Sequence, residues 1–154
     1  MIESVLYFRE GSFDINGVCA AHINRKELVQ EAAAKARGHT LEVGFGHGLS
    51  HAALHANPLV TSIVVIEKHQ EVLERFKTCD CLVVVDDYCE ATIDDTFNTI
   101  FIDVHCGDVP ASIQAAPLLN YLAPDGHFII FRQDKYGENN RFEVHDATTL
   151  RHPA

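Results

Sequence analysis

The feature that most constrains the fold is a series of short apolar runs separated by segments of helical periodicity. Five such runs are rich in β-branched or aromatic residues: Thr40–Val43, Ile63–Ile66, Leu82–Val85, Ile100–Ile102 and Phe128–Phe131. Ile63–Ile66 is an unbroken β-branched stretch, which is typical of a parallel strand covered on both faces. Strands that alternate with helices at this spacing indicate right-handed βαβ units. We therefore predict an α/β fold with a mostly parallel sheet in three αβα layers.

The segments between these runs predict the helical layers. Asn24 and Glu27 resemble a capping box, and apolar residues then recur at helical spacing as far as Ala36. Gly38 is placed to end this helix in a left-handed conformation. Three further helices are expected, over Leu49–Ala56, Gln70–Phe76 and Ile113–Leu122, and Pro117 marks a break or a late start in the last of them.

The length of 154 residues predicts one domain. Its expected parts are an N-terminal hairpin or lid with a helix (1–39), the core (40–132) and a short C-terminal extension (133–154). Around the turn signal Glu10–Ser12, a hairpin and a loose lid both fit the sequence. Arg141–His145 is expected to form one short strand in the extension.

Composition argues against several classes of partner. The net charge is −10, and the 12 Lys and Arg residues form no basic stripe, so we expect no nucleic-acid partner. No apolar run approaches the roughly 18 residues of a membrane span, and the N-terminus does not resemble a secretory signal, so a cytoplasmic protein is expected. The five cysteines are odd in number and scattered, which favours reduced thiols over a zinc site.

Polar residues follow three successive strands of the predicted sheet. The glycine-rich segment Glu42–Gly48 comes directly after the first strand, where glycines let the backbone turn sharply and approach a ligand closely. Glu67 ends the second strand and can accept hydrogen bonds from both hydroxyls of a ribose. Asp86 and Asp87 follow the third strand, where they suit an adenine amino group. Ligands of such sheets bind outside the carboxyl ends of the strands, so these residues form a candidate nucleotide site.

This chain resembles class I S-adenosylmethionine-dependent methyltransferases, whose sheet is Rossmann-like. It shares with them, in order, the motif D/E-x-G-x-G-x-G, an acidic residue at the end of the second strand and an Asp after the third. The resemblance continues in Phe97–Asp103, which is similar to the family's fourth strand, and in Leu122–His127, which is similar to its L-x-P-G-G turn. It covers roughly Thr40–Arg132. A dinucleotide site would instead need a small third residue in G-x-G-x-x-G/A, and Leu49 occupies that position.

This resemblance implies S-adenosylmethionine as cofactor and gives each residue a role. Gly44, Gly46 and Gly48 would contact the methionine end of the cofactor, and Glu67 would bind the ribose. Asp87, with Asp86 beside it, would bind the adenine, and Asp103 would lie at the front of the active site. Glu42 would order the loop and contact the cofactor amino group through water.

Methyl transfer from a sulfonium depends mainly on alignment of the reacting groups, since the donor is already activated. Asp103 or His105 is a candidate to hold or remove an acceptor proton, although His105 also fits an exposed loop histidine. No D/N-P-P-Y/F sequence follows the fourth strand, which argues against an enzyme that methylates DNA amino groups. The expected acceptor is a small molecule.

Two other functions remain open at this point. Polyamine aminopropyltransferases, which use decarboxylated S-adenosylmethionine, share several of these positions, but their G-G-G-D-G-G loop differs from Gly44–Gly48. A non-catalytic binding or regulatory subunit is also compatible, because only 22 residues follow Arg132 and the family's sheet usually ends in an antiparallel pair of strands. The shortened edge also predicts a homodimer or higher oligomer.

Three histidines recur every four residues in this region, at His47, His51 and His55. His51 and His55 have the spacing of a two-histidine metal site on a helix. The apolar residues Leu49, Ala52, Ala53 and Ala56 are expected to form the buried stripe, which places the histidines on the polar side and predicts no metal site.

Overall fold

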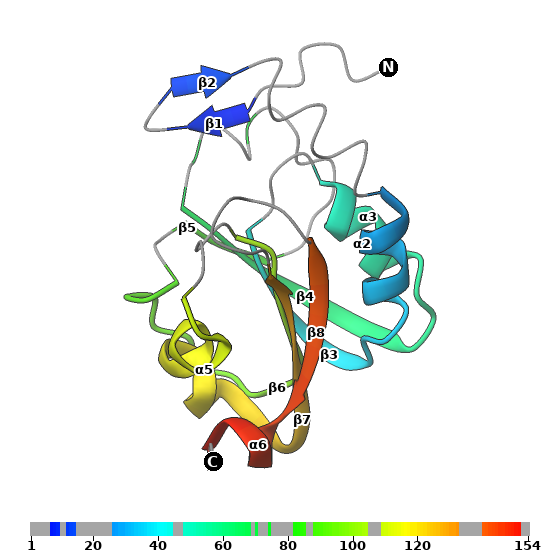
Figure 1. The fold of residues 1–154 in the computed structure, drawn as a ribbon, viewed down its shortest axis with the longest axis vertical. Coiled ribbons are helices and arrows are strands. Elements are labelled where there is room, and N and C mark those ends of the chain that lie inside the picture. The colour runs from blue at the N-terminus through cyan, green and yellow to red at the C-terminus, as the bar shows by residue number, and fades with distance from the viewer. Residues whose placement is uncertain are drawn as a thin grey trace.

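The computed structural model describes residues 7–9, 12–14, 26–44, 48–68, 70, 74, 82–85, 88–104, 109–132 and 140–151. Six strands form one sheet in the order β5-β4-β3-β6-β7-β8 (Figure 1). Their bounds are β3 (Gly38–Val43), β4 (Val60–Glu67), β5 (Leu82–Val85), β6 (Phe97–Ile102), β7 (Leu122–Arg132) and β8 (Arg141–Asp146). All neighbours pair in parallel except β7 and β8. The mostly parallel sheet is confirmed, and the extension adds one antiparallel edge strand.

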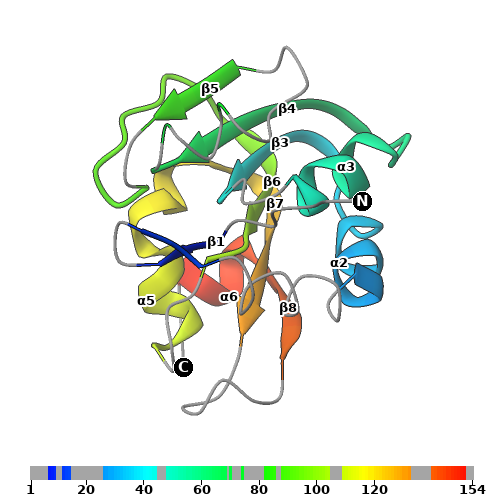
Figure 2. The ribbon, with the colours of Figure 1, turned by 90° about the horizontal axis from the view of Figure 1, so that it is seen from above.

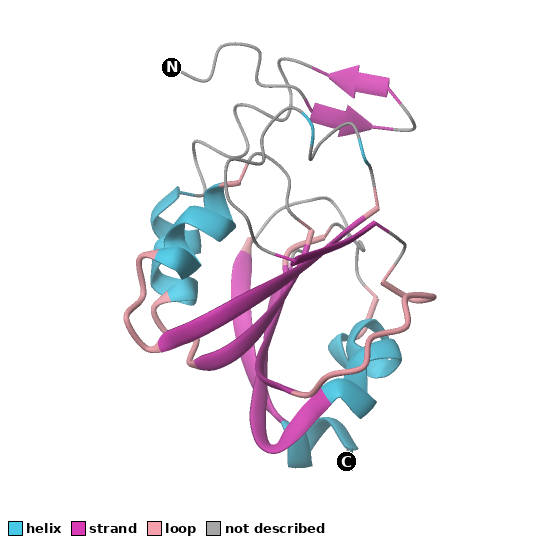
Figure 3. Cartoon of the chain, turned by 180° about the vertical axis from the view of Figure 1, so that it is seen from behind, coloured by secondary structure: helices cyan, strands magenta, loops and turns pink. Residues whose placement is uncertain are grey.

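Helices cover both faces of this sheet (Figures 2 and 3). On one face lie α2 (Lys26–Ala33) and α3 (Leu49–His55), and on the other lie α5 (Ala111–Ala115), the 3-10 helix η1 (Ala116–Tyr121) and α6 (Ala147–Arg151). Alternate residues of β6 enter the two apolar cores, since Ile100 and Ile102 pack toward α5, η1 and α6, whereas Phe101 packs toward α2 and α3. The predicted three-layer arrangement is therefore confirmed.

The chain between α2 and β3 differs from the prediction. The helix ends at Ala33, and Gly38, with φ of +72°, begins β3 instead of ending the helix. The amide of Asn57 provides the missing cap, because its Nδ2 donates to the carbonyls of Ala33 (2.9 Å) and Ala36 (2.8 Å). The side chain of Asn57, which follows α3, thus satisfies the last carbonyl of α2 and one carbonyl of the turn that follows it.

We expect Asn57→Ala to lower the free energy of unfolding by about 2 kcal/mol, because the hydrogen bonds to Ala33 O at the end of α2 and to Ala36 O in the following turn are lost. Urea denaturation of both proteins measures this difference. Asn57→Asp is the matched control: it keeps an oxygen for the Leu59 N–H but has no donor for the two carbonyls. Wild-type stability in the aspartate variant would show that the amide does not cap the helix.

The segment from Ala111 to Arg132 also departs from the prediction. The helical segment begins at Ala111 instead of Ile113, and the break predicted at Pro117 is confirmed, since α5 ends at Ala115 and η1 begins at Ala116 with Pro117 in its first turn. Proline has no N–H to continue an α-helix. The strand β7 then begins six residues earlier than expected, and the turn predicted within Leu122–His127 lies in an irregularity of this strand, between the pairs Leu122–Phe97 and His127–Thr99.

The first part of the chain contains a separate two-stranded antiparallel sheet, β1 (Tyr7–Arg9) with β2 (Ser12–Asp14). The capping box at Asn24 lies outside the described residues. Most of the predicted helix Gln70–Phe76 does so too, although Gln70 and Glu74 are helical. None of the helices in the described part of the chain has both the length and the apolar character needed to cross a membrane.

Candidate functional site

The carboxyl ends of β3 and β6 meet at the point where the strand order reverses. The chain builds β4 and β5 on one side of β3 and then returns to build β6 and β7 on its other side. The exit of β3 is joined to both neighbouring strands, because Asp103 N, directly after β6, donates to Val43 O (3.0 Å) and Gly44 N donates to Ile66 O of β4 (2.8 Å). Open α/β sheets bind ligands at this kind of switch point.

Gly44 makes the first turn after β3, and its position leaves no room for a side chain. Its φ is +90°, a backbone conformation that other residues rarely adopt. A Cβ there would lie 2.6 Å from Asp103 O and 2.9 Å from Val104 Cγ1. Gly48, with φ of +84°, directly precedes α3. The sequence-predicted glycines therefore make two left-handed turns around this edge, and Gly46 lies outside the described residues.

Glu42 lies one residue before the end of β3, and its side chain is fully buried. Its Oε1 lies 3.1 Å from His51 Nδ1, whereas its Oε2 is buried without a hydrogen-bond partner among the described residues. Burial raises the pKa of Glu42 to about 7, and the negative charges of Asp103 and Glu67 add to this effect, while His51 opposes it. A buried carboxylate oxygen without a partner is unfavourable unless a ligand or a water molecule donates a hydrogen bond to it.

Two further carboxylates lie at the same edge. Asp103 directly follows β6 and accepts a hydrogen bond of 2.9 Å from the hydroxyl of Ser50, which is buried at the start of α3. Glu67 is the last residue of β4 and is also buried. The site thus presents three acidic groups from three adjacent strand ends, a charge distribution that favours a cationic ligand.

Four of the sequence-predicted site residues cannot be placed: Gly46, Asp86, Asp87 and His105 lie outside the described residues. The strands that precede them, β3, β5 and β6, end at the same edge of the sheet. Their assignments stay predictions. Of the predicted set, Glu42, Gly44, Gly48, Glu67 and Asp103 are brought to one edge.

Ser50 was not among the predicted site residues, and His51 lies on the buried face of α3 instead of the polar side where it was predicted. The prediction that α3 buries its alanines is wrong, because its buried residues are Ser50, His51 and Leu54. The buried carboxylate of Glu42 provides a partner for the imidazole, which allows this polar ring to face the sheet. Residues three or four positions apart share one face of a helix, so the spacing of Ser50 and His51 from the apolar Leu54 could have indicated that both lie on the buried face.

His55 is exposed, with its ring centroid 6.0 Å from that of His51. Among the residues that the structure describes, no group of three His, Cys, Asp or Glu side chains is arranged to hold a metal ion.

Comparisons with known proteins show likeness in structure only. No protein-family model matches the chain, and no curated protein matches it. One similar solved structure is a chain of the complex between the Haloferax volcanii Trm112 methyltransferase activator and a methyltransferase (TM-score 0.57, 15% identity, 75% of this chain and 56% of that one). Another is the N-methyltransferase NodS from Bradyrhizobium japonicum in complex with S-adenosyl-L-homocysteine (TM-score 0.56, 16% identity, 83% and 71%).

A third is CalS10 with bound S-adenosylmethionine, an amino pentose methyltransferase from Micromonospora echinaspora (TM-score 0.55, 15% identity, 80% and 58%). The chain spans little more than half the length of the first and third of these structures. At such identities the likeness concerns the fold. The chain therefore has the Rossmann-like α/β fold of class I S-adenosylmethionine-dependent methyltransferases.

Proposed function

We propose that this chain binds S-adenosylmethionine at the carboxyl edge of its sheet and transfers the methyl group to a small-molecule acceptor. The observation that carries the proposal is Glu42, whose Oε2 is buried beside the Gly44 turn and has no hydrogen-bond partner in the part of the chain that the structure describes. This oxygen is an acceptor for the amino group of the cofactor, directly or through water. The position is the switch point of the strand order, where such folds bind their ligands.

The remaining residues fit a cationic nucleoside. Glu67 at the end of β4 would accept from the ribose hydroxyls, Asp86 and Asp87 after β5 would accept from the adenine amino group, and the glycines would let the backbone approach the methionine end. Bound S-adenosylmethionine would supply an activated methyl group. The three acidic strand ends match its positive charge.

In the transfer itself, the protein would align the acceptor and hold its proton. Asp103 is positioned for this by Ser50, whose hydroxyl donates to Asp103 Oδ2 and limits the rotation of the carboxylate. His105 follows two residues later and is the second candidate base. Since the donor is already activated, alignment and exclusion of water account for most of the rate.

Calorimetry with S-adenosylmethionine tests the proposal. We expect the wild type to bind, Glu67→Ala to weaken binding about 10- to 100-fold through loss of charge-assisted hydrogen bonds, and Asp103→Ala to keep binding but lose turnover. Turnover is measured as S-adenosylhomocysteine formed with a panel of small amines, acids and phenols. Glu31→Ala removes an exposed acidic residue from α2 and serves as the control for net charge.

No binding by the wild type would contradict the proposal. Binding without turnover across the panel would contradict methyl transfer and leave a binding protein. If Asp103→Ala abolished binding while Glu67→Ala bound normally, the two roles assigned here would be wrong.

A further inference from the structure

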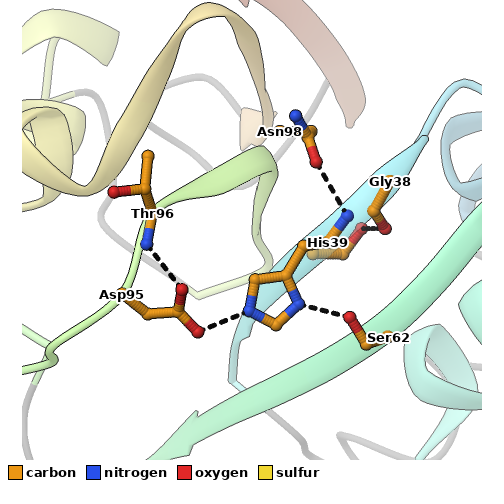
Figure 4. Close-up of polar contacts among 7 residues, drawn as sticks. Gly38, His39, Ser62, Asp95, Thr96 and Asn98 are labelled. Carbon is orange, nitrogen blue, oxygen red and sulfur yellow. Dashed lines mark hydrogen bonds and ion pairs between the residues drawn. The ribbon is translucent and has the colours of Figure 1, made fainter.

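A second cluster of reactive side chains lies at the opposite edge of the same sheet. His39 on β3, Ser62 on β4 and Asp95 just before β6 converge at the amino ends of these strands (Figure 4). His39 and Val43 are four residues apart on β3, so this edge lies about 13 Å from the carboxyl edge, where the cofactor is proposed to bind. The cluster is therefore a separate site from the one described above.

The three side chains form a continuous hydrogen-bonded chain. His39 Nδ1 is bonded to Ser62 Oγ, and His39 Nε2 lies 2.6 Å from Asp95 Oδ2. The hydrogen bond from His39, together with one from the Thr96 N–H, lowers the pKa of Asp95. At neutral pH Asp95 is thus a carboxylate, which can only accept hydrogen bonds.

This carboxylate determines which nitrogen of His39 carries the proton. The hydrogen must reside on Nε2 to bind Asp95, which leaves the lone pair of Nδ1 facing the hydroxyl of Ser62. Ser62 then donates to Nδ1. This is the arrangement of a serine nucleophile with a general base and a carboxylate that orients the base.

The imidazole is also held by contacts outside the cluster. Its ring stacks on Phe97, with centroids 4.6 Å apart and planes inclined by 20°. The backbone N–H of His39 donates to Asn98 Oδ1 at 2.9 Å. The ring therefore keeps its orientation when Ser62 moves or reacts. The side chains of His39 and Asp95 remain 26% and 44% exposed, and Ser62 is exposed, so a reagent in solution can reach the cluster.

We propose that Ser62 is the nucleophile of a second site, which accepts the acyl group of small activated esters. The Ser62 Oγ–carbonyl bond forms, the bond to the leaving phenoxide breaks, and the hydroxyl proton passes to His39 Nδ1 and then to the phenoxide. Water repeats the sequence and releases the carboxylic acid. Among the described residues the cluster provides a base and a nucleophile, a pair that suits an ester with a good leaving group rather than an amide.

The test is labelling by an alkyl fluorophosphonate, followed by peptide mapping, together with hydrolysis of 4-nitrophenyl acetate. We expect the label on Ser62 in the wild type and none at that position in Ser62→Ala. His39→Gln should slow labelling about 100-fold, the usual contribution of a general base. Asp95→Asn should slow it about 10-fold or more, because an amide can donate to Nε2 and favours the wrong tautomer.

Thr61→Ala is the matched control, since it removes the neighbouring exposed hydroxyl on β4 and should leave labelling unchanged. Asp95 is exposed, so Asp95→Asn keeps the proposal testable if His39→Gln fails to fold. A label elsewhere than Ser62, or wild-type labelling rates in Asp95→Asn, would overturn the proposal. Ser62→Ala should bind S-adenosylmethionine as the wild type does, and loss of that binding would overturn the independence of the two sites.

Discussion

Replacing Gly44 by alanine is expected to lower the free energy of unfolding by about 3 kcal/mol and to abolish cofactor binding. The left-handed backbone at this residue is strained for alanine, and the new Cβ would lie 2.6 Å from the carbonyl oxygen of Asp103. Because that oxygen belongs to the backbone, the contact can be relieved only by separating the exits of β3 and β6. The same separation would displace Glu42 and Asp103 from one another.

Urea denaturation and calorimetry with S-adenosylmethionine measure the two effects. Gly38→Ala is the matched control, since Gly38 also has a positive φ but lies at the opposite edge of the sheet and would meet the side chain of Asn98. We expect that variant to be destabilised and still to bind. Wild-type stability and binding in Gly44→Ala would show that the turn tolerates a side chain.

Stability is expected to fall as the pH rises from about 4.5 to about 7, and Glu42 is the cause. Its pKa is about 7 in the folded chain and 4.5 as the reference value for the unfolded chain. Both states carry a neutral carboxyl below pH 4.5, whereas between the two values the unfolded chain ionises and the folded chain does not. Ionisation therefore favours unfolding, and the difference corresponds to about 3 kcal/mol once the pH exceeds 7.

Glu42→Gln isolates this effect because the amide has nearly the same shape and does not ionise. We expect the variant and the wild type to have similar unfolding free energies at pH 4, and the variant to be more stable at pH 8. Chemical denaturation at both pH values measures the comparison. An equal difference between the two proteins at both pH values would contradict the raised pKa.

The same ionisation predicts a proton release on cofactor binding. A cationic amino group at Oε2 would lower the pKa of Glu42, so S-adenosylmethionine should displace its proton near pH 6.5. Calorimetry in two buffers of different ionisation enthalpy detects the release as a difference in apparent binding enthalpy. Equal enthalpies in the two buffers would place the cofactor amino group away from Glu42.

The sequence alone was sufficient to predict the sheet and the acidic residues of its carboxyl edge. Apolar β-branched runs such as Ile63–Ile66 are stable only when both faces are covered, so a parallel sheet between helices follows from their spacing. Carboxylates directly after such strands must share one edge, because parallel strands end on the same side. Glu67 and Asp103 could be assigned to that edge for this reason.

The partners of those residues depended on the tertiary structure. The packing of α3 on β3 buries His51. It also places the ring beside one carboxylate oxygen of Glu42 and leaves the other, among the described residues, without a partner. The approach of Ser50 to Asp103, and of Asp95 to His39 and Ser62, joins residues between 23 and 56 positions apart in the chain. These distances depend on strand order and register, which local sequence patterns do not encode. The periodicity of the chain therefore determined the sheet and its acidic edge, and only the packing of distant segments decided which side chains meet there.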